Sequence, residues 1–218
     1  MTNFAAARIN MVEGQIRPNK VVDPNLVNAL MSVPREQFVP KEARGIAYVD
    51  EDIPLGSGRF LMEPLVLGRL LQAAAVGPDE VVLDVGCGTG YSTAVLAKMA
   101  ATVVGLETDK ELAARAMETL RGVGVDNALV IEGALADGYP AQAPYDVILL
   151  GGAVAEVPGA LLDQLADGGR LVGIVVSGRG LGEAKLFRKA GSVVSSRNLF
   201  EAGTPLLPGF ELKPRFVF

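Results

Sequence analysis

From residue 79 onward, hydrophobic residues fall into short continuous runs, separated by stretches with helical spacing. Apolar runs rich in β-branched residues are typical of strands buried in a parallel sheet, and they occupy residues 81–85, 102–106, 128–131, 146–150 and 170–176. Helical spacing lies between them, over residues 91–99, 110–121 and 157–165. This alternation predicts an α/β fold with a doubly wound, mostly parallel, Rossmann-like sheet. Closing strands are expected at residues 184–189, 192–200 and 215–218.

The first part of the chain has a different pattern and predicts an N-terminal helical segment. Apolar residues between Phe4 and Leu30 recur with helical spacing. A connector rich in glycine and proline follows over residues 54–64, and a further helix is expected over 65–75. We therefore assign residues 1–64 to the helical segment with its connector and residues 65–218 to the Rossmann-like domain, within one compact domain overall.

A glycine-rich turn after the first apolar run is the most informative motif. Gly86, Gly88 and Gly90 stand on alternate residues before the helical pattern at Tyr91. Because glycine has no Cβ, the backbone here can approach a ligand closely, and in α/β sheets such ligands lie at the carboxyl ends of the strands. The dinucleotide fingerprint is excluded because Tyr91 stands at its third glycine position. A phosphate-binding P-loop is excluded because no lysine follows before Lys98.

A carboxylate ends the second apolar run. Glu107 stands about 20 residues after the glycine loop, where an acid can accept hydrogen bonds from both ribose hydroxyls of an adenosine ligand. Strand, glycine loop, helix, strand and terminal acid together indicate a site for S-adenosylmethionine. The alternative is a glycine turn that only packs a helix on the sheet, with Glu107 a solvated carboxylate at the strand end.

Composition narrows the chemistry available to this site. The chain of 218 residues has no histidine and one cysteine, Cys87, which excludes histidine-dependent nucleophiles, an intrachain disulfide and a histidine or cysteine metal site. The net charge of −5 argues against a nucleic-acid surface. No apolar stretch reaches the roughly 20 residues of a membrane span, and the start lacks a signal-peptide pattern, so we expect a cytoplasmic protein. A cofactor that carries its own reactive methyl group suits such a chain.

Several blocks carry a resemblance to a known family. Residues 33–40 read Val-Pro-Arg-Glu-Gln-Phe-Val-Pro, and the glycine loop over residues 82–91 is followed by blocks at 143–146 and 164–172. These blocks resemble the V-P-R-E-x-F-V-P, the V-L-E-I-G-T-G-S-G-Y and the later motifs of the protein-L-isoaspartate O-methyltransferases. The resemblance covers about residues 11–176. It implies a class I methyltransferase with S-adenosylmethionine as methyl donor, S-adenosylhomocysteine as product and isoaspartyl peptides or proteins as acceptors.

The resemblance also implies roles for individual residues. The family's active-site connector reads G-x-G-Q-T-I-S-Q-P, and the same positions here read Gly-Ser-Gly-Arg-Phe-Leu-Met-Glu-Pro. Met62 therefore stands in place of the active-site serine, Phe60 replaces a threonine, and Glu63 follows. Ala134 replaces the acid implied to meet the adenine amine. The residues expected to contact the cofactor are Asp84, Gly86, Cys87, Gly88, Thr89, Gly90, Tyr91, Glu107, Thr108, Ala134, Leu135 and Gly151.

The altered connector leaves more than one interpretation. Phe60, Leu61 and Met62 either form an apolar wall over the methyl group or are core residues beneath the connector, with Glu63 solvated. A substrate carboxylate is ionised at neutral pH and needs no general base. An amine or phenol acceptor would need one, and Glu63 is the nearest candidate. Two functions therefore stand beside isoaspartyl methylation: methylation of a more apolar small molecule, and a non-catalytic role in which the cofactor is only bound.

Other polar side chains each have a functional and a structural interpretation. Asp84 either holds the loop or the methionine ammonium group, or is satisfied by backbone amides. Cys87 is either a thiolate beside a helix N-terminus or a small space-filling residue. Tyr91 is expected to pack rather than react. Arg17 and Arg35 either meet an acidic substrate or occupy ordinary surface positions.

Overall fold

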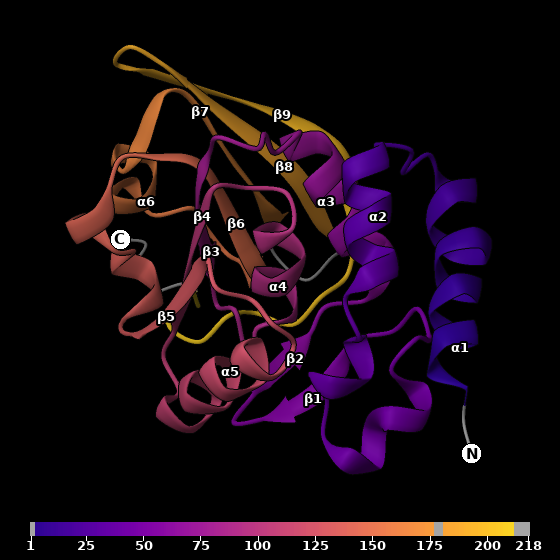
Figure 1. Ribbon diagram of the computed structural model, residues 1–218. Coiled ribbons are helices and arrows are strands. Elements are labelled where there is room, and N and C mark those ends of the chain that lie inside the picture. Colours follow the sequence, from indigo (N-terminus) through magenta and orange to yellow (C-terminus); the bar gives the residue numbers. More distant parts are fainter. Residues whose placement is uncertain (1–2, 177–180, 212–218) are drawn as a thin grey trace.

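The computed structural model describes residues 3–176 and 181–211, and its centre is a seven-stranded sheet of order β5-β4-β3-β6-β7-β8-β9 (Figure 1). The strands are β3 (Val81–Val85), β4 (Thr102–Glu107), β5 (Ala128–Glu132), β6 (Tyr145–Val154), β7 (Leu165–Val175), β8 (Gly182–Ala190) and β9 (Val193–Ala202). Neighbouring strands from β5 to β7 are parallel, and β8 and β9 add antiparallel partners at one edge. The predicted doubly wound, mostly parallel α/β sheet is confirmed.

Helices cover the two faces of this sheet unequally. They are α1 (Phe4–Met11), α2 (Pro24–Ser32), α3 (Pro64–Ala74), α4 (Tyr91–Ala97), α5 (Lys110–Gly122) and α6 (Gly159–Asp163). Shorter helical turns are η1 (Val12–Ile16), η2 (Arg17–Asn19), η3 (Arg35–Gln37), η4 (Lys41–Ile46), η5 (Leu135–Asp137) and η6 (Pro140–Gln142). Successive side chains of a strand point to opposite faces of the sheet. Val82 of β3 therefore packs in the hydrophobic cluster that contains residues of α1 to α5, whereas Leu83 packs in a second cluster, which contains residues of α6. Figure 1 shows α6 on the opposite side of the sheet from α2 and α4.

The strands expected at 146–150 and 170–176 are longer in the structure, where they are β6 and β7, and two other expected elements differ as well. The helix expected over 157–165 is only α6, because Leu165 already begins β7 and pairs with Tyr145. The connector over residues 54–64 is not irregular throughout, because it contains an antiparallel hairpin of β1 (Ile53–Gly56) and β2 (Arg59–Leu61). The expected strand at 215–218 lies outside the described residues.

The β1–β2 hairpin is a two-stranded sheet of its own, separate from the central sheet. Ser57 and Gly58 form its turn with φ angles of +51° and +68°. A type I′ turn has positive φ at both central residues, and its backbone twist matches the right-handed twist of the two strands that it joins. The turn directs Arg59, the first residue of β2, back towards the carboxyl ends of the central strands.

A segment near the end of the described chain runs along the carboxyl end of β6. The backbone N–H of Ala153 donates to Pro205, and that of Leu207 donates to the carbonyl of Ala153. These two bonds fix Leu207 next to the loops at the top of the sheet, where its side chain is fully buried. Among the described residues, the helices are too short or too polar to cross a membrane.

Candidate functional site

The strand order places a crevice at the carboxyl ends of β3 and β6. The chain leaves β3 towards β4 and leaves β6 towards β7, in opposite directions, and ligands of open α/β sheets bind at such a switch point. The strand β6 touches the loop after β3, since a Cβ added at Gly151 of β6 would lie 2.4 Å from the carbonyl oxygen of Gly86. Gly151 is therefore required for this close approach.

The connector faces the glycine loop across a small hollow. Its lining is mostly apolar and consists of Phe60, Leu61, Met62, Leu67, Gly86, Cys87, Ser92 and Gly151. The volume enclosed is about 10 Å³, which is close to the space of a single water molecule. The structure thus brings Phe60 and Met62 together with Gly86, Cys87 and Gly151.

Glu107 lies at the end of β4, completely buried. Its Oε2 accepts a hydrogen bond of 2.7 Å from the backbone N–H of Gly88, and its Oε1 accepts from Thr108 at 2.8 Å and Asp109 at 3.2 Å. Three backbone donors therefore fix the carboxylate beside the glycine loop. Such an arrangement holds a negative charge in a buried place, so the alternative of a solvated Glu107 is wrong.

A fourth partner of Glu107 comes from the connector. Arg59 of β2 is 3% exposed, and its Nε lies 3.2 and 3.3 Å from the two carboxylate oxygens of Glu107. Its Nη2 donates a 2.6 Å hydrogen bond to the carbonyl oxygen of Gly86. The guanidinium therefore neutralises Glu107 and also touches the first glycine of the loop.

Side chains of the protein itself cover the glycine loop. A Cβ added at Gly86 would lie 2.7 Å from Nη2 of Arg59 and 2.8 Å from Cδ2 of Leu207. A Cβ added at Gly88 would lie 2.8 Å from Cδ1 of Leu55 in β1. The missing Cβ atoms thus permit close packing by Arg59, Leu55 and Leu207 in this structure.

Asp84 is a buried carboxylate beneath the same loop. Its Oδ2 accepts hydrogen bonds of 2.7 Å from the hydroxyls of Ser92 and Thr93 in α4, so hydroxyls, and not backbone amides, satisfy it. Its Oδ1 is buried and has no hydrogen-bond partner among the described residues. Burial raises the pKa of Asp84 to about 6; the two hydroxyls oppose this shift, and the charge of Glu107 adds to it.

Comparison with known proteins identifies the family. A family model described as protein-L-isoaspartate(D-aspartate) O-methyltransferase matches residues 7–202. This chain belongs to that family. The protein-L-isoaspartate O-methyltransferase of Koribacter versatilis is 41% identical over 172 residues, which are 79% of this chain and 78% of the relative. That of Roseiflexus castenholzii is 35% identical over 208 residues, which are 95% of this chain and 94% of the relative.

Solved structures of the same family share the fold. A protein-L-isoaspartate O-methyltransferase structure superposes with a TM-score of 0.80 at 22% identity, covering 94% of this chain and 65% of that chain. A Plasmodium falciparum structure, a β-aspartate methyltransferase in complex with S-adenosyl-L-homocysteine, gives a TM-score of 0.79 at 21% identity, covering 95% of this chain and 99% of that chain. The family consists of O-methyltransferases that use S-adenosylmethionine.

The block at residues 33–40 that resembles the family has a structural role here. Arg35 is fully buried, and it donates hydrogen bonds of 2.7 Å to the carbonyl oxygens of Ala47 and Met62. Its guanidinium also lies 4.7 Å from the centre of the Tyr91 ring. Arg35 therefore fixes the connector and the start of α4, so the expected surface position is wrong, and the buried guanidinium does not face an acidic substrate in this structure. Arg17 forms an exposed ion pair with Glu13.

Three of the expected cofactor contacts are packing residues in this structure. Tyr91 is fully buried and meets Phe38 edge to face, with ring centroids 5.6 Å apart. The hydroxyl of Thr89 donates to the carbonyl of Phe38. Burial raises the pKa of the Cys87 thiol well above its usual value, so Cys87 is a neutral space-filling residue rather than a thiolate. Tyr91 packs, as the sequence predicts.

Glu63, Ala134 and Leu135 are not among the residues that line the small hollow between the connector and the glycine loop. The carboxyl group of Glu63 lies near Asp50 and Asp52, and burial together with these two charges raises its pKa to about 7.

Within the described residues, no group of acidic and cysteine side chains is arranged to hold a metal ion. Ala134 is exposed and Leu135 is buried at the start of η5, after β5.

Sequence reasoning missed Arg59, Leu55 and Leu207. A signal existed for Arg59, because it is an arginine at the glutamine position of the family's connector, in an otherwise apolar stretch. No local signal distinguishes Leu207, which reaches the loop only through the pairing of its segment with β6.

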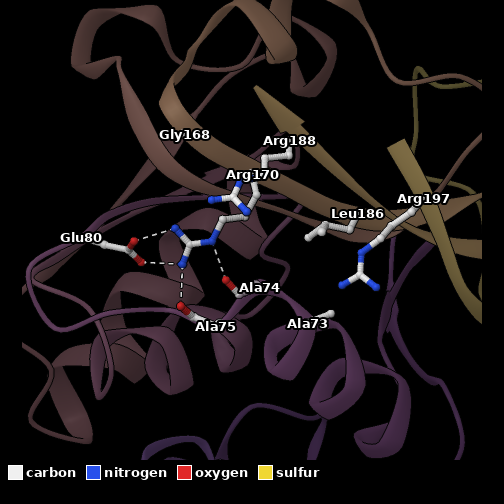
Figure 2. A pocket seen from close by; sticks show the side chains of 9 residues that line it. All are labelled: Ala73, Ala74, Ala75, Glu80, Gly168, Arg170, Leu186, Arg188 and Arg197. Carbon is white, nitrogen blue, oxygen red and sulfur yellow. Dashed lines mark hydrogen bonds and ion pairs between the residues drawn. The ribbon is translucent and has the colours of Figure 1, made fainter. Parts of the chain in front are cut away.

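A larger hollow of about 340 Å³ lies beside Glu80, which precedes β3, and so at the amino ends of the parallel strands. Figure 2 shows the side chains that line it. Arg170 is fixed there by Glu80 and by the carbonyl oxygens of Ala74 and Ala75. Through these hydrogen bonds, Arg170 of β7 attaches the C-terminal end of α3 to the central sheet. Arg188, also at this hollow, is exposed, and its guanidinium forms no hydrogen bond or ion pair within the part of the chain that the structure describes (Figure 2).

Proposed function

We infer that this chain transfers a methyl group from S-adenosylmethionine to the carboxylate of isoaspartyl residues in peptides or proteins. The observation that carries the proposal is the buried carboxylate of Glu107, held by three backbone amides beside the glycine loop in a chain that belongs to this family over residues 7–202. An acid at that place suits the two hydroxyls of a ribose.

The residues present fit the cofactor, provided that Arg59 leaves Glu107. Glu107 would then accept the ribose hydroxyls, and the unpartnered Oδ1 of Asp84 would accept the methionine ammonium group. Ala134 and Leu135 would lie on the adenine side, where the backbone and apolar contacts replace the family's acid. The bound cofactor supplies the electrophilic methyl group.

The other residues of the site would align the acceptor and exclude water. An acceptor carboxylate is already ionised at neutral pH and needs no base, which agrees with a chain that has no histidine. Phe60 and Met62 make the crevice apolar, and Arg35 fixes the Met62 carbonyl and so the path of the connector. Alignment and exclusion of water are contributions that need no titrating side chain.

One observation favours a second function, methylation of a more apolar small molecule. The threonine and serine of the family's connector are Phe60 and Met62 here, and Ser92 supplies the only side-chain hydroxyl among the residues that line the described hollow. Hydrogen bonds that would orient an isoaspartyl carboxylate are therefore fewer. In this case Glu63, with a pKa of about 7, would be the nearest group able to take a proton.

Transfer of labelled methyl from S-adenosylmethionine tests the proposal. The acceptors are an isoaspartyl peptide, the same peptide with normal aspartate, and an apolar phenol. We expect label in the isoaspartyl peptide alone, and we expect alkali to release it because a methyl ester is hydrolysed where an ether is not. Label in the phenol alone would favour the second function. Binding of the cofactor without transfer to any acceptor would favour a non-catalytic protein.

The acceptors proposed here rest on the family, whereas the proposed compartment rests on composition. We propose isoaspartyl proteins as partners in the cytoplasm, with neither nucleic acid nor membrane involved, on the basis of the net charge of −5 and a single cysteine that is free and buried. Fractionation of cells followed by immunodetection tests the location.

A further inference from the structure

The carboxylate proposed for the ribose is already fully engaged within the chain. Arg59 approaches both oxygens of Glu107 at 3.2 and 3.3 Å, in addition to the three backbone amides that fix this carboxylate. A ribose that donates two hydrogen bonds to Glu107 would compete with Arg59 for the same oxygens. Cofactor and guanidinium therefore exclude each other at this carboxylate.

The side chains that cover the loop come from segments outside the central sheet. Arg59 and Leu55 belong to the β1–β2 hairpin, which pairs only with itself among the described strands. Isolated two-stranded hairpins are marginally stable in water, so the contacts of Arg59 and Leu55 with the glycine loop contribute to holding this one in place. Ile53 and Leu61 of the hairpin are also buried in the core, so its withdrawal would break apolar contacts but no pairing of the central sheet.

We propose that Arg59 is an internal competitor of the cofactor and that the β1–β2 hairpin must withdraw before S-adenosylmethionine or S-adenosylhomocysteine binds. The proposal rests on the function proposed above. When only a fraction of the molecules is open, the apparent dissociation constant rises by the inverse of that fraction. Arg59 thus lowers the affinity of the chain for its cofactor, and it is a residue that positions the hairpin rather than one that reacts.

Calorimetric titration with S-adenosylhomocysteine tests the competition. Arg59→Gln restores the residue of the family's connector and removes the charge that Glu107 binds, so its affinity is expected to be at least tenfold higher than that of the parent. Arg188→Gln is the matched control, because the same change is made at an exposed arginine at the other end of the sheet (Figure 2). The control is expected to bind like the parent.

A second variant opens the site without touching the ion pair. Leu207→Ala removes the side chain that lies 2.8 Å from the Cβ position of Gly86. It is expected to bind S-adenosylhomocysteine more tightly than the parent, by a smaller factor than Arg59→Gln. This variant keeps the test valid if Arg59→Gln does not fold.

Hydrogen exchange supplies a readout that needs no ligand. Amides of residues 53–61 are expected to exchange faster in Arg59→Gln than in the parent, and faster in the parent once S-adenosylhomocysteine is bound. Equal binding by parent, Arg59→Gln and Leu207→Ala would overturn the competition and leave the proposed function standing. Absence of binding in all three would overturn both. Unchanged exchange at the hairpin would overturn the competition alone.

Discussion

Removing either member of the Arg59–Glu107 pair is expected to destabilise the fold more than removing both. Arg59 is 3% exposed and Glu107 is 0% exposed, so neither charge can turn to water when its partner is lost. Breaking a buried pair costs about 3–5 kcal/mol, whereas replacing both charges is often close to neutral. The two single changes should therefore not be additive.

The structure ranks the two single changes. In Arg59→Gln, Glu107 keeps three backbone donors, which places the loss of unfolding free energy near the lower end, about 3 kcal/mol. In Glu107→Gln, Arg59 keeps its full charge with one carbonyl partner, Gly86, and the backbone donors lose a charged acceptor. We expect a loss of about 4 kcal/mol there. The double variant should lose only about 1–2 kcal/mol, less than either single variant, because neither charge is left buried without its partner; additive changes would give about 7 kcal/mol.

Urea unfolding of the four proteins at pH 7 measures this coupling. The control is the same cycle at Arg17 and Glu13, whose side chains are 51% and 55% exposed and whose coupling should stay below about 0.5 kcal/mol. High salt should weaken the control pair and leave the buried pair unchanged. Additive losses at Arg59 and Glu107 would refute the reasoning, because they would show that the two charges do not depend on each other.

Three further predictions follow from the same site. The pKa of Asp84 is raised to about 6, so the native state binds this proton more tightly than the unfolded chain, and stability should fall by roughly 3 kcal/mol as pH rises from 4 to 7. Asp84→Asn should flatten this part of the urea-unfolding profile, and an equal slope in both proteins would contradict the assignment. Arg35→Met removes two buried hydrogen bonds to backbone carbonyls and should lower the unfolding free energy by about 3 kcal/mol; a loss below 1 kcal/mol would argue against its role in fixing the connector. Phe60→Thr with Met62→Ser should raise methyl transfer to an isoaspartyl peptide about ten- to a hundredfold, through one or two restored hydrogen bonds. High activity in the parent would show that these hydroxyls are dispensable.

The order of strands and helices follows from patterns that lie within a few neighbouring residues. Continuous apolar runs predict β3, β4 and β5 to within one residue. The central strands β3 and β4 are buried on both faces and need apolar side chains at successive positions, and the half-buried edge strand β5 has a similar run. The β1–β2 hairpin was missed because glycine and proline dominate its sequence, although Ser57-Gly58 carries the turn. The helix predicted to end at residue 165 ends at Asp163 in the structure. Leu161 and Leu165 are four residues apart and both buried, which fits helical spacing, but Leu161 belongs to α6 and Leu165 begins β7.

The sequence by itself determined the family, the glycine loop and the position of Glu107 at the end of its strand. Each depends on residues close together in the chain. Only the tertiary structure decided what Glu107 binds, because Arg59 is 48 residues away along the chain and reaches it from a separate hairpin. A buried arginine must find a carboxylate or carbonyl partner, but its sequence position does not tell which one. Folding brings the connector and the segment around Leu207 onto the same loop, and these contacts between distant segments determine whether the cofactor site is open or closed.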